Sequence, residues 1–146
     1  MQRETHLIFA FLMFVMFSLI LHFSPLQSVF AFIGALIPDI DIKPRSWHRK
    51  VGHNIWFLMI ILYLGFIYRI FDRTSAIVLS IGFFSHLIAD SLTHAGIMPL
   101  WPLKRPKFNG PITTGGLGEY LIVIILLFMI YWLGSLVDPL LALLIL

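Results

Sequence analysis

His86 and Asp90, two side chains that can bind a metal, are four residues apart in the segment FFSHLIAD. In a helix this spacing puts both on one face, one turn apart. A histidine and an aspartate so placed can bind the same metal ion or two adjacent ions. Ionisable residues inside apolar helices are energetically expensive and are commonly functional. We therefore expect Asp90 to have a functional role and His86 to share it.

A second polar group lies in the segment PDIDIKPRSWHRKVGH, residues 38–53. Asp39 and Asp41 alternate along a stretch expected to be extended after a proline, so their carboxylates repel each other unless a cation lies between them. His48 and His53 follow in the same segment. Oxygen and nitrogen donors without sulfur suit Zn²⁺, Mn²⁺, Fe²⁺ or Co²⁺ better than Ca²⁺ or Cu⁺. We expect a divalent transition metal, with Zn²⁺ or Mn²⁺ preferred.

The number of candidate ligands exceeds what one tetrahedral ion requires. One or two ions are therefore expected, with Asp39 or Asp90 as the bridge if there are two. Two-metal centres activate water and hold the oxygens of a displaced group, as in phosphoester hydrolysis. The candidate metal ligands are His6, Asp39, Asp41, His48, His53, His86 and Asp90.

The composition indicates that lipid is the solvent of this chain. Of its 146 residues 60% are hydrophobic and 12% are charged, whereas a soluble domain has about 25% charged residues. The chain has no cysteine, which excludes disulfides and thiolate metal sites. We predict one integral membrane domain over residues 1–146, in contact with membrane lipids and without a nucleic-acid partner.

Five apolar runs predict an all-α, polytopic bundle of about five transmembrane or membrane-embedded helices, since a bilayer requires about 20 residues per helix. Ser24 is expected to cap the second run, and Thr74 or Ser75 the fourth, which Gly96 ends. The tail LLALLIL, residues 140–146, is expected to form a short re-entrant or interfacial piece. The runs cover residues 6–23, 24–41, 54–71, 74–96 and 118–137.

The basic residues predict the orientation. If all five runs cross the membrane, eight Lys and Arg residues lie on one side and two on the other. The richer side is expected to be cytoplasmic. The candidate ligands come from separate segments but all fall at that same side, as does Glu119 at the start of the fifth run. This convergence predicts a polar site that faces the cytoplasm at the plasma (inner) membrane.

Simpler interpretations exist for single residues. Asp41 is as well explained by solvation among the lipid headgroups. A hydrogen-bonded core histidine would explain His86 alone. Retention of positive charge on the cytoplasmic side explains Arg49 as well as anion binding does. His22 is expected to be interfacial, and His94 to be structural or to contact a ligand without binding metal.

Three segments together resemble the YdjM-type membrane-bound, metal-dependent hydrolases: GALIPDID, WHRKVGH and FFSHLIADSLTHAGIMPLWP. The order of these segments and the early His6 match that family over most of the chain. The resemblance implies a small integral protein of the inner membrane with hydrolase activity. It points to the seven candidate ligands as the polar centre, and to Ser85 and Thr93 as groups that support them.

The function that we predict is a membrane-bound, metal-dependent hydrolase. A metal-activated water would attack a phosphoester or other ester of an amphiphilic substrate, such as a lipid, at the cytoplasmic interface. Asp39 and Asp90 are the expected catalytic carboxylates, and Arg49 would neutralise developing negative charge. Two alternatives stay open: a membrane transporter or metal-handling protein, and a non-catalytic scaffold with a structural metal site.

Overall fold

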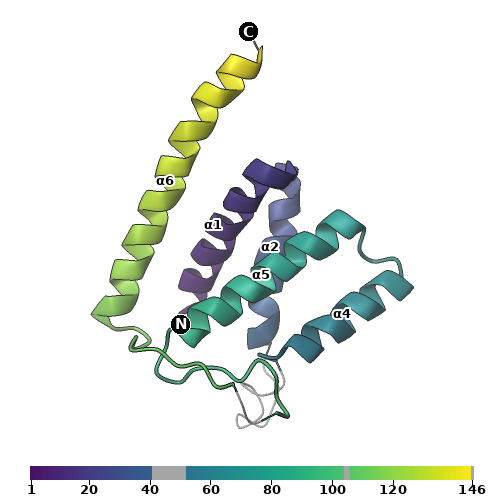
Figure 1. Cartoon of the computed structure of the whole chain (residues 1–146), viewed down its shortest axis with the longest axis vertical. Helices are drawn as coiled ribbons and strands as arrows, with labels where there is room; N and C mark the ends of the chain where they lie inside the picture. Colours follow the sequence, from purple (N-terminus) through teal and green to yellow (C-terminus); the bar gives the residue numbers. More distant parts are fainter. Residues whose placement is uncertain (41–51, 104–105, 146) are drawn as a thin grey trace.

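The computed structural model describes residues 1–40, 52–103 and 106–145, with side chains described up to residue 135. Within these ranges the protein is all-α, as predicted, with five α-helices and two short 3₁₀ segments (Figure 1). No strand occurs there, only isolated bridges between Thr93 and Ile112 and between Ile97 and Phe108. The elements are α1 (Arg3–Leu21), η1 (Pro25–Gln27), α2 (Ser28–Leu36), η2 (Ile37–Asp39), α4 (Ile55–Ile67), α5 (Arg73–Ser91) and α6 (Leu117–Ile145).

Three of the described helices are long and apolar enough to cross a membrane: α1, α5 and the Leu117–Ser135 part of α6. The other two apolar segments, Pro25–Asp39 and Ile55–Ile67, are shorter. At 1.5 Å per residue, α4 is about 20 Å long, which is less than the hydrocarbon thickness of about 30 Å. Both α2 and α4 are therefore too short to cross the membrane alone as straight helices. Only residues 55–67 of the predicted run 54–71 are α-helical.

The helix ends agree with the predicted caps at one place and differ at another. Pro25 begins η1, and the backbone N–H of Ser24 donates to Gln27 Oε1 at 2.8 Å, as in a capping box. The cap of α5 is Asp72 rather than Thr74 or Ser75, because its carboxylate accepts the Ser75 N–H at 2.7 Å. The hydrogen bonds from Ser75 lower the pKa of Asp72, which keeps the cap ionised.

Two further boundaries correct the sequence prediction. Helix α5 ends at Ser91 and not at Gly96, since the Thr93 hydroxyl donates to the Asp90 carbonyl at 2.8 Å and the chain then turns. Helix α6 continues through Asp138 and Pro139 to Ile145, so the C-terminal residues do not form a separate piece. A side-chain hydrogen bond therefore sets the end of α5, and Asp138-Pro139 does not end α6.

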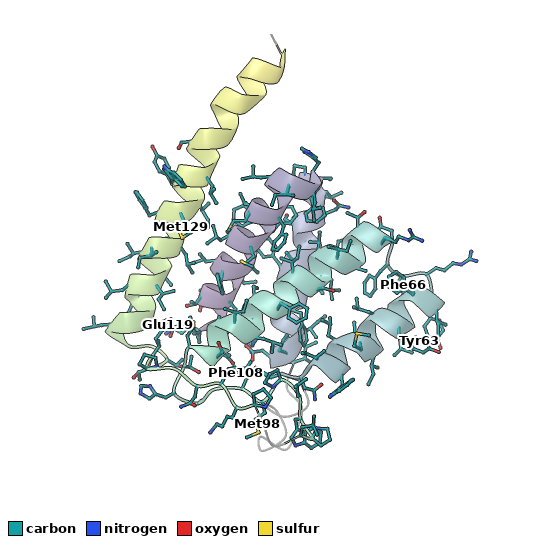
Figure 2. The ribbon with its side chains drawn as sticks, viewed as in Figure 1. Tyr63, Phe66, Met98, Phe108, Glu119 and Met129 are labelled. Carbon is teal, nitrogen blue, oxygen red and sulfur yellow. The ribbon has the colours of Figure 1, made fainter. Side chains whose placement is uncertain are left out.

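Helix α5 is the centre of the bundle. Of the residues in its span 61% are buried, compared with 28% in α1 and 11% in α6. Leu79 and Phe83 on α5 are fully buried and pack with Ile37 and Leu58 in one apolar cluster. Figure 2 shows Tyr63 on α4 pointing away from this core, and both Tyr63 and Met129 on α6 are exposed.

Helix α2 lies directly against α5 because two glycines allow the backbones to touch. A Cβ atom on Gly34 would overlap the Leu79 carbonyl oxygen, and one on Gly82 would overlap the Ala31 carbonyl oxygen. Small residues permit such close approach between helices in membranes. This contact fixes the end of α2, and with it Asp39, beside α5.

The ends of several elements meet at one end of the bundle. The start of α1, the end of α2, the start of α4, the end of α5 and the start of α6 all lie at the lower end in Figure 1. The loop segments 92–103 and 106–116 lie at the same end. This arrangement brings residues from five parts of the chain to one place.

Candidate metal centre

Asp90 lies at the middle of a buried cluster of histidines and carboxylates. Its Oδ2 atom is 3.2 Å from His53 Nε2 and 3.7 Å from His86 Nε2. Its Oδ1 atom is 3.3 Å from His6 Nε2 and 2.6 Å from the α-amino group of Met1. The two carboxylate oxygens therefore face two different sets of partners. This is the geometry by which one carboxylate can bridge two cation positions.

The orientation of the His86 ring leaves a lone pair directed into the cluster. Its Nδ1 atom lies 2.7 Å from the Ala35 carbonyl oxygen, which can only accept a hydrogen bond. Nδ1 therefore carries the proton, and in the neutral ring Nε2 is free to bind a metal. Nε2 lies 3.1 Å from His53 Nε2. A carbonyl oxygen behind the ring is the usual support of a metal-binding histidine.

Asp39 reaches the same cluster from the end of η2, the 3₁₀ segment that follows α2. Its Oδ1 atom is 3.7 Å from His86 Nε2 and 3.8 Å from His53 Nε2. Its side chain is 24% exposed, whereas those of His53, His86 and Asp90 are at most 4% exposed. Asp39 therefore marks the side of the cluster that is open to solvent.

The donor atoms of His53, His86 and Asp90 have the spacing of ligands that share one metal ion. With metal–ligand bonds of about 2.0–2.1 Å, the ligand atoms of a tetrahedral Zn²⁺ site lie about 3.3 Å apart. The three distances among His53 Nε2, His86 Nε2 and Asp90 Oδ2 are 3.1, 3.2 and 3.7 Å. Asp39 Oδ1 is 3.7–3.8 Å from the two histidine nitrogens and could add a further ligand. The buried Asp90 carboxylate has the Met1 amine beside one oxygen, and the partly exposed Asp39 adds a second negative charge that a cation between them would balance. The nitrogen and oxygen donors, their spacing and their charge all suit a divalent cation.

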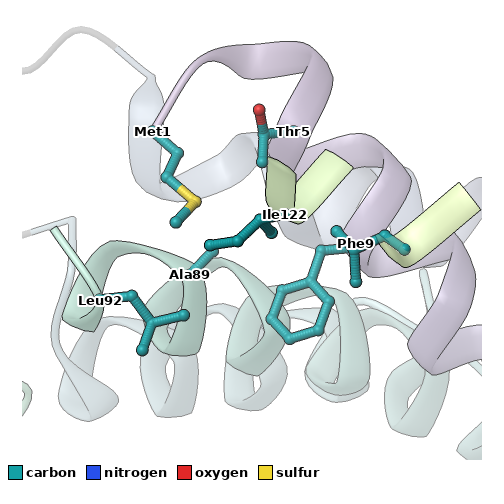
Figure 3. Close-up of a pocket in the computed structure, with 7 residues that line it drawn as sticks. Met1, Thr5, Phe9, Ala89, Leu92 and Ile122 are labelled. Atoms are coloured by element: carbon teal, nitrogen blue, oxygen red, sulfur yellow. The ribbon is translucent and has the colours of Figure 1, made fainter. Parts of the chain in front are cut away.

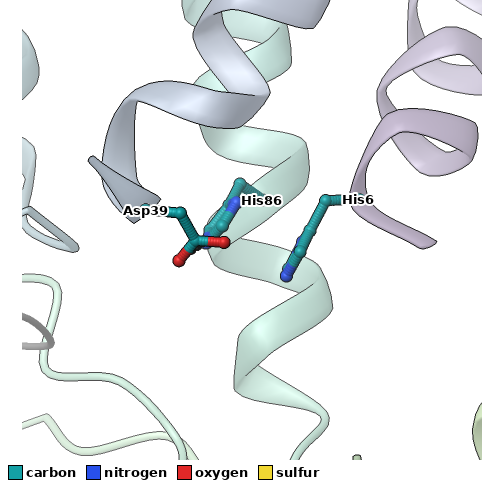
Figure 4. Close-up of side chains that lie close together, drawn as sticks. All are labelled: His6, Asp39 and His86. Atoms are coloured by element: carbon teal, nitrogen blue, oxygen red, sulfur yellow. Dashed lines mark ion pairs between the residues drawn. The ribbon is translucent and has the colours of Figure 1, made fainter. Parts of the chain in front are cut away.

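His6 lies on the other side of Asp90. Its ring stacks on that of His86, with centroids 3.7 Å apart and planes inclined by 10°. Figure 4 shows His6 on α1, Asp39 at the end of η2 and His86 on α5 directed toward one another. The His6 side chain is fully buried, and its Nδ1 atom has no hydrogen-bond partner among the described residues. His6, Asp39 and His86 offer ligand atoms within 4.8 Å of one another. A second group, His53, His86 and Asp90, does the same.

Of the seven ligands predicted from the sequence, the structure brings five together. The separate segments that carry them meet as the convergence argument expected. Asp41 and His48, and with them the predicted anion-binding Arg49, lie outside the described residues. The cluster residues are His6, Asp39, His53, His86 and Asp90.

Other predicted residues have smaller roles in the geometry. The Thr93 hydroxyl bonds to the backbone of Asp90, so it supports the end of α5 beside the cluster. The Ser85 hydroxyl donates to the Gly82 carbonyl at 2.7 Å within α5 and does not touch the cluster through that bond. His94 and His22 are exposed.

Sequence reasoning missed two backbone groups at this site. The α-amino group of Met1 contacts Asp90, and the Ala35 carbonyl orients His86. Backbone groups are present at every residue, so no residue type signals them.

Comparison with known proteins agrees with this picture. The family model described as YdjM inner membrane protein matches residues 1–146, the whole sequence. No match was found among curated proteins or among solved structures. Three membrane-crossing candidates and an apolar composition are in keeping with an inner-membrane protein. Because the family model covers the complete sequence, this chain belongs to the YdjM inner membrane protein family.

Proposed function

We propose that this protein is a membrane-bound, metal-dependent hydrolase that cleaves a phosphoester or another ester of an amphiphilic substrate. The observation that carries the proposal is the convergence of three buried donor atoms, on His53, His86 and Asp90, that lie 3.1–3.7 Å apart. The partly exposed Asp39 lies within 3.8 Å of both histidine nitrogens. When bound, a divalent transition metal such as Zn²⁺ or Mn²⁺ polarises an ester oxygen and makes water a stronger nucleophile.

The residues of the chain would divide the remaining work. His53, His86 and Asp90 are buried and hold the centre in place, while His6 faces the second oxygen of Asp90 and offers a further position. Asp39 reaches solvent and is the carboxylate best placed to accept a proton from the attacking water. Arg49 would neutralise negative charge on the substrate, a role that rests on the sequence alone.

An apolar cavity beside the cluster supports an amphiphilic substrate. Its volume is about 150 Å³, and it lies between α1, α5 and α6, the three membrane-crossing candidates (Figure 3). Thr5 and Ala89 in its wall are the chain neighbours of His6 and Asp90. An alkyl chain held there would leave its polar end near the cluster. The wall consists of Met1, Thr5, Phe9, Ala89, Leu92, Ile122 and Leu126.

The test combines metal analysis with an ester panel. Detergent-purified protein is expected to retain one or two equivalents of a transition metal and to hydrolyse p-nitrophenyl phosphoesters or carboxylic esters. Ala89→Phe fills the cavity and should lower kcat/KM for long-chain esters by about tenfold or more, because each buried methylene contributes about 0.8 kcal/mol. Short-chain esters should be unaffected. Ile88→Phe, on the exposed neighbouring position, is the matched control.

A second candidate function is a non-catalytic scaffold with a structural metal site. It is favoured by the position of Asp39, whose Oδ1 lies within 3.8 Å of both histidine nitrogens and could supply a fourth protein ligand. Structural zinc sites are usually closed by four protein ligands. Stoichiometric metal without turnover on any ester would support this alternative. Absence of metal, even after reconstitution with Zn²⁺ or Mn²⁺, would contradict both candidates and favour a transport role.

We further propose that the cluster faces the cytoplasm. The proposal rests on the eight-to-two distribution of basic residues in the sequence. Because α1 begins at the cluster end and α6 ends at the opposite end (Figure 1), reporters at the two termini should lie on opposite sides of the membrane. We expect an alkaline phosphatase fused after residue 146 to be active and a fluorescent protein fused before Met1 to be cytoplasmic. An inactive C-terminal phosphatase would contradict this orientation.

A further inference from the structure

Glu119 is a buried carboxylate outside the cluster. It lies in the first turn of α6, is 1% exposed and is labelled near the lower end of that helix in Figure 2. Three donors bond to it: Gln2 N–H at 2.6 Å and the Thr5 hydroxyl at 2.7 Å to Oε1, and Gly115 N–H at 2.7 Å to Oε2. An ionised group is buried at this depth only when such bonds replace water.

Two of these donors belong to the chain segment that carries His6. Thr5 directly precedes His6, and Gln2 directly follows Met1. Both His6 Nε2 and the Met1 amine contact Asp90 Oδ1. The Glu119 bonds thus connect the start of α6 to the first turn of α1. Each α1 donor to Glu119 is the chain neighbour of a residue that contacts Asp90.

We propose that Glu119 is a positioning residue that holds the first turn of α1 so that His6 faces Asp90. The metal aspect of this inference rests on the proposed function, because it assumes that the cluster binds a cation. Helix α6 is otherwise mostly exposed, with 11% of its span buried, so this bond set is a main anchor between α6 and the cluster end of α1. Loss of the Glu119 carboxylate would release the first turn of α1 and misalign the His6 ring.

A local role is the competing explanation. Glu119 accepts from Gly115 just before α6, and a negative charge in the first turn favours any helix. A purely local role would affect α6 alone. A positioning role acts through His6 and must disappear once His6 is removed.

A double-mutant cycle separates the two roles. Zn²⁺ affinity is measured by competition with a chelating dye for wild type, Glu119→Ala, His6→Ala and the double variant in detergent. Removing a group that orients a metal ligand typically costs 10–100-fold in affinity. We expect that loss for Glu119→Ala alone and a change of less than about twofold when His6 is already alanine. Equal losses in both backgrounds, or none in either, would overturn the inference.

Further variants test the same inference if Glu119→Ala does not fold. Thr5→Val removes one of the three donors and should give a smaller loss in the same direction. Glu119→Gln keeps an acceptor oxygen and should retain more affinity than Glu119→Ala. Glu4→Ala, an exposed acid on the same turn of α1, should leave affinity unchanged. If Glu119→Ala fails to fold, the Thr5 and Gln variants carry the same cycle.

A readout without metal distinguishes failure of this inference from failure of the proposed function. In metal-free protein, modification of His6 by diethyl pyrocarbonate is followed by mass spectrometry. Buried His6 should react slowly in wild type and at least about tenfold faster in Glu119→Ala, while exposed His22 reacts equally in both. If wild type binds no Zn²⁺, the proposed function fails and this rate still decides the role of Glu119. An unchanged rate of His6 modification in Glu119→Ala would overturn the positioning role of Glu119.

Discussion

Asp90→Ala is expected to remove bound metal from the purified protein while leaving membrane insertion intact. Asp90 has one oxygen 3.2 Å from His53 and the other 3.3 Å from His6, so its loss affects both sides of the cluster. We expect metal affinity to fall by more than 100-fold, beyond the 10–100-fold that supporting groups typically contribute. Insertion depends on the apolar helices and not on one carboxylate. Elemental analysis of the detergent-purified variant measures the effect.

Two further variants show whether the loss of metal comes from the Asp90 carboxylate. Asp90→Asn keeps the shape and removes the charge, so a loss of metal in this variant would assign the effect to the carboxylate. Asp72→Ala removes an exposed aspartate at the other end of the same helix and should retain metal. Metal content unchanged in Asp90→Ala would take Asp90 out of the site.

Gly82→Val is expected to separate α2 from α5 and to disrupt the cluster from a distance. A Cβ atom at this position overlaps the Ala31 carbonyl oxygen, and a backbone atom cannot rotate away as a side chain can. Overpacking of a core usually costs about 1–3 kcal/mol, and we expect this substitution to reach or exceed that range. Because α2 leads directly to Asp39, metal binding should fall together with thermal stability. A thermal shift assay and elemental analysis measure the two effects.

The matched control is Gly134→Val. Gly134 lies on the exposed surface of α6, and a Cβ atom there meets nothing within 4 Å. The same substitution should therefore leave stability and metal content near the wild-type values. Wild-type behaviour of Gly82→Val would contradict the close packing of α2 on α5.

Some features of the site follow from short-range rules. His86 and Asp90 share a helix face because of their four-residue spacing, and their ligand atoms are 3.7 Å apart in the structure. The apolar runs predicted an all-α membrane protein because lipid requires every backbone polar group to be bonded within its own segment. Both rules concern residues that are neighbours along the chain, which is why sequence alone was sufficient.

Other features depend on which segments lie side by side. The roles of Glu119 and of the Ala35 carbonyl come from contacts between residues 114 and 51 positions apart. The end of α5 at Ser91 and its cap at Asp72 differ from the predicted Gly96 and Thr74 or Ser75, because specific hydrogen bonds set both ends. A pattern of residue types does not encode such choices, because many arrangements of the same segments satisfy it equally.

By itself, the sequence determined that this chain is a membrane-embedded helical protein with a surplus of histidines and aspartates toward one side. Hydrophobicity and helical periodicity act locally, and they are sufficient for that conclusion. Only the tertiary structure decided that Asp90 faces partners on both of its oxygens, and that Gly34 and Gly82 bring Asp39 within reach of His86. Those distances are set by the packing of α1 and α2 on α5, and packing depends on the shapes of surfaces far apart in the chain.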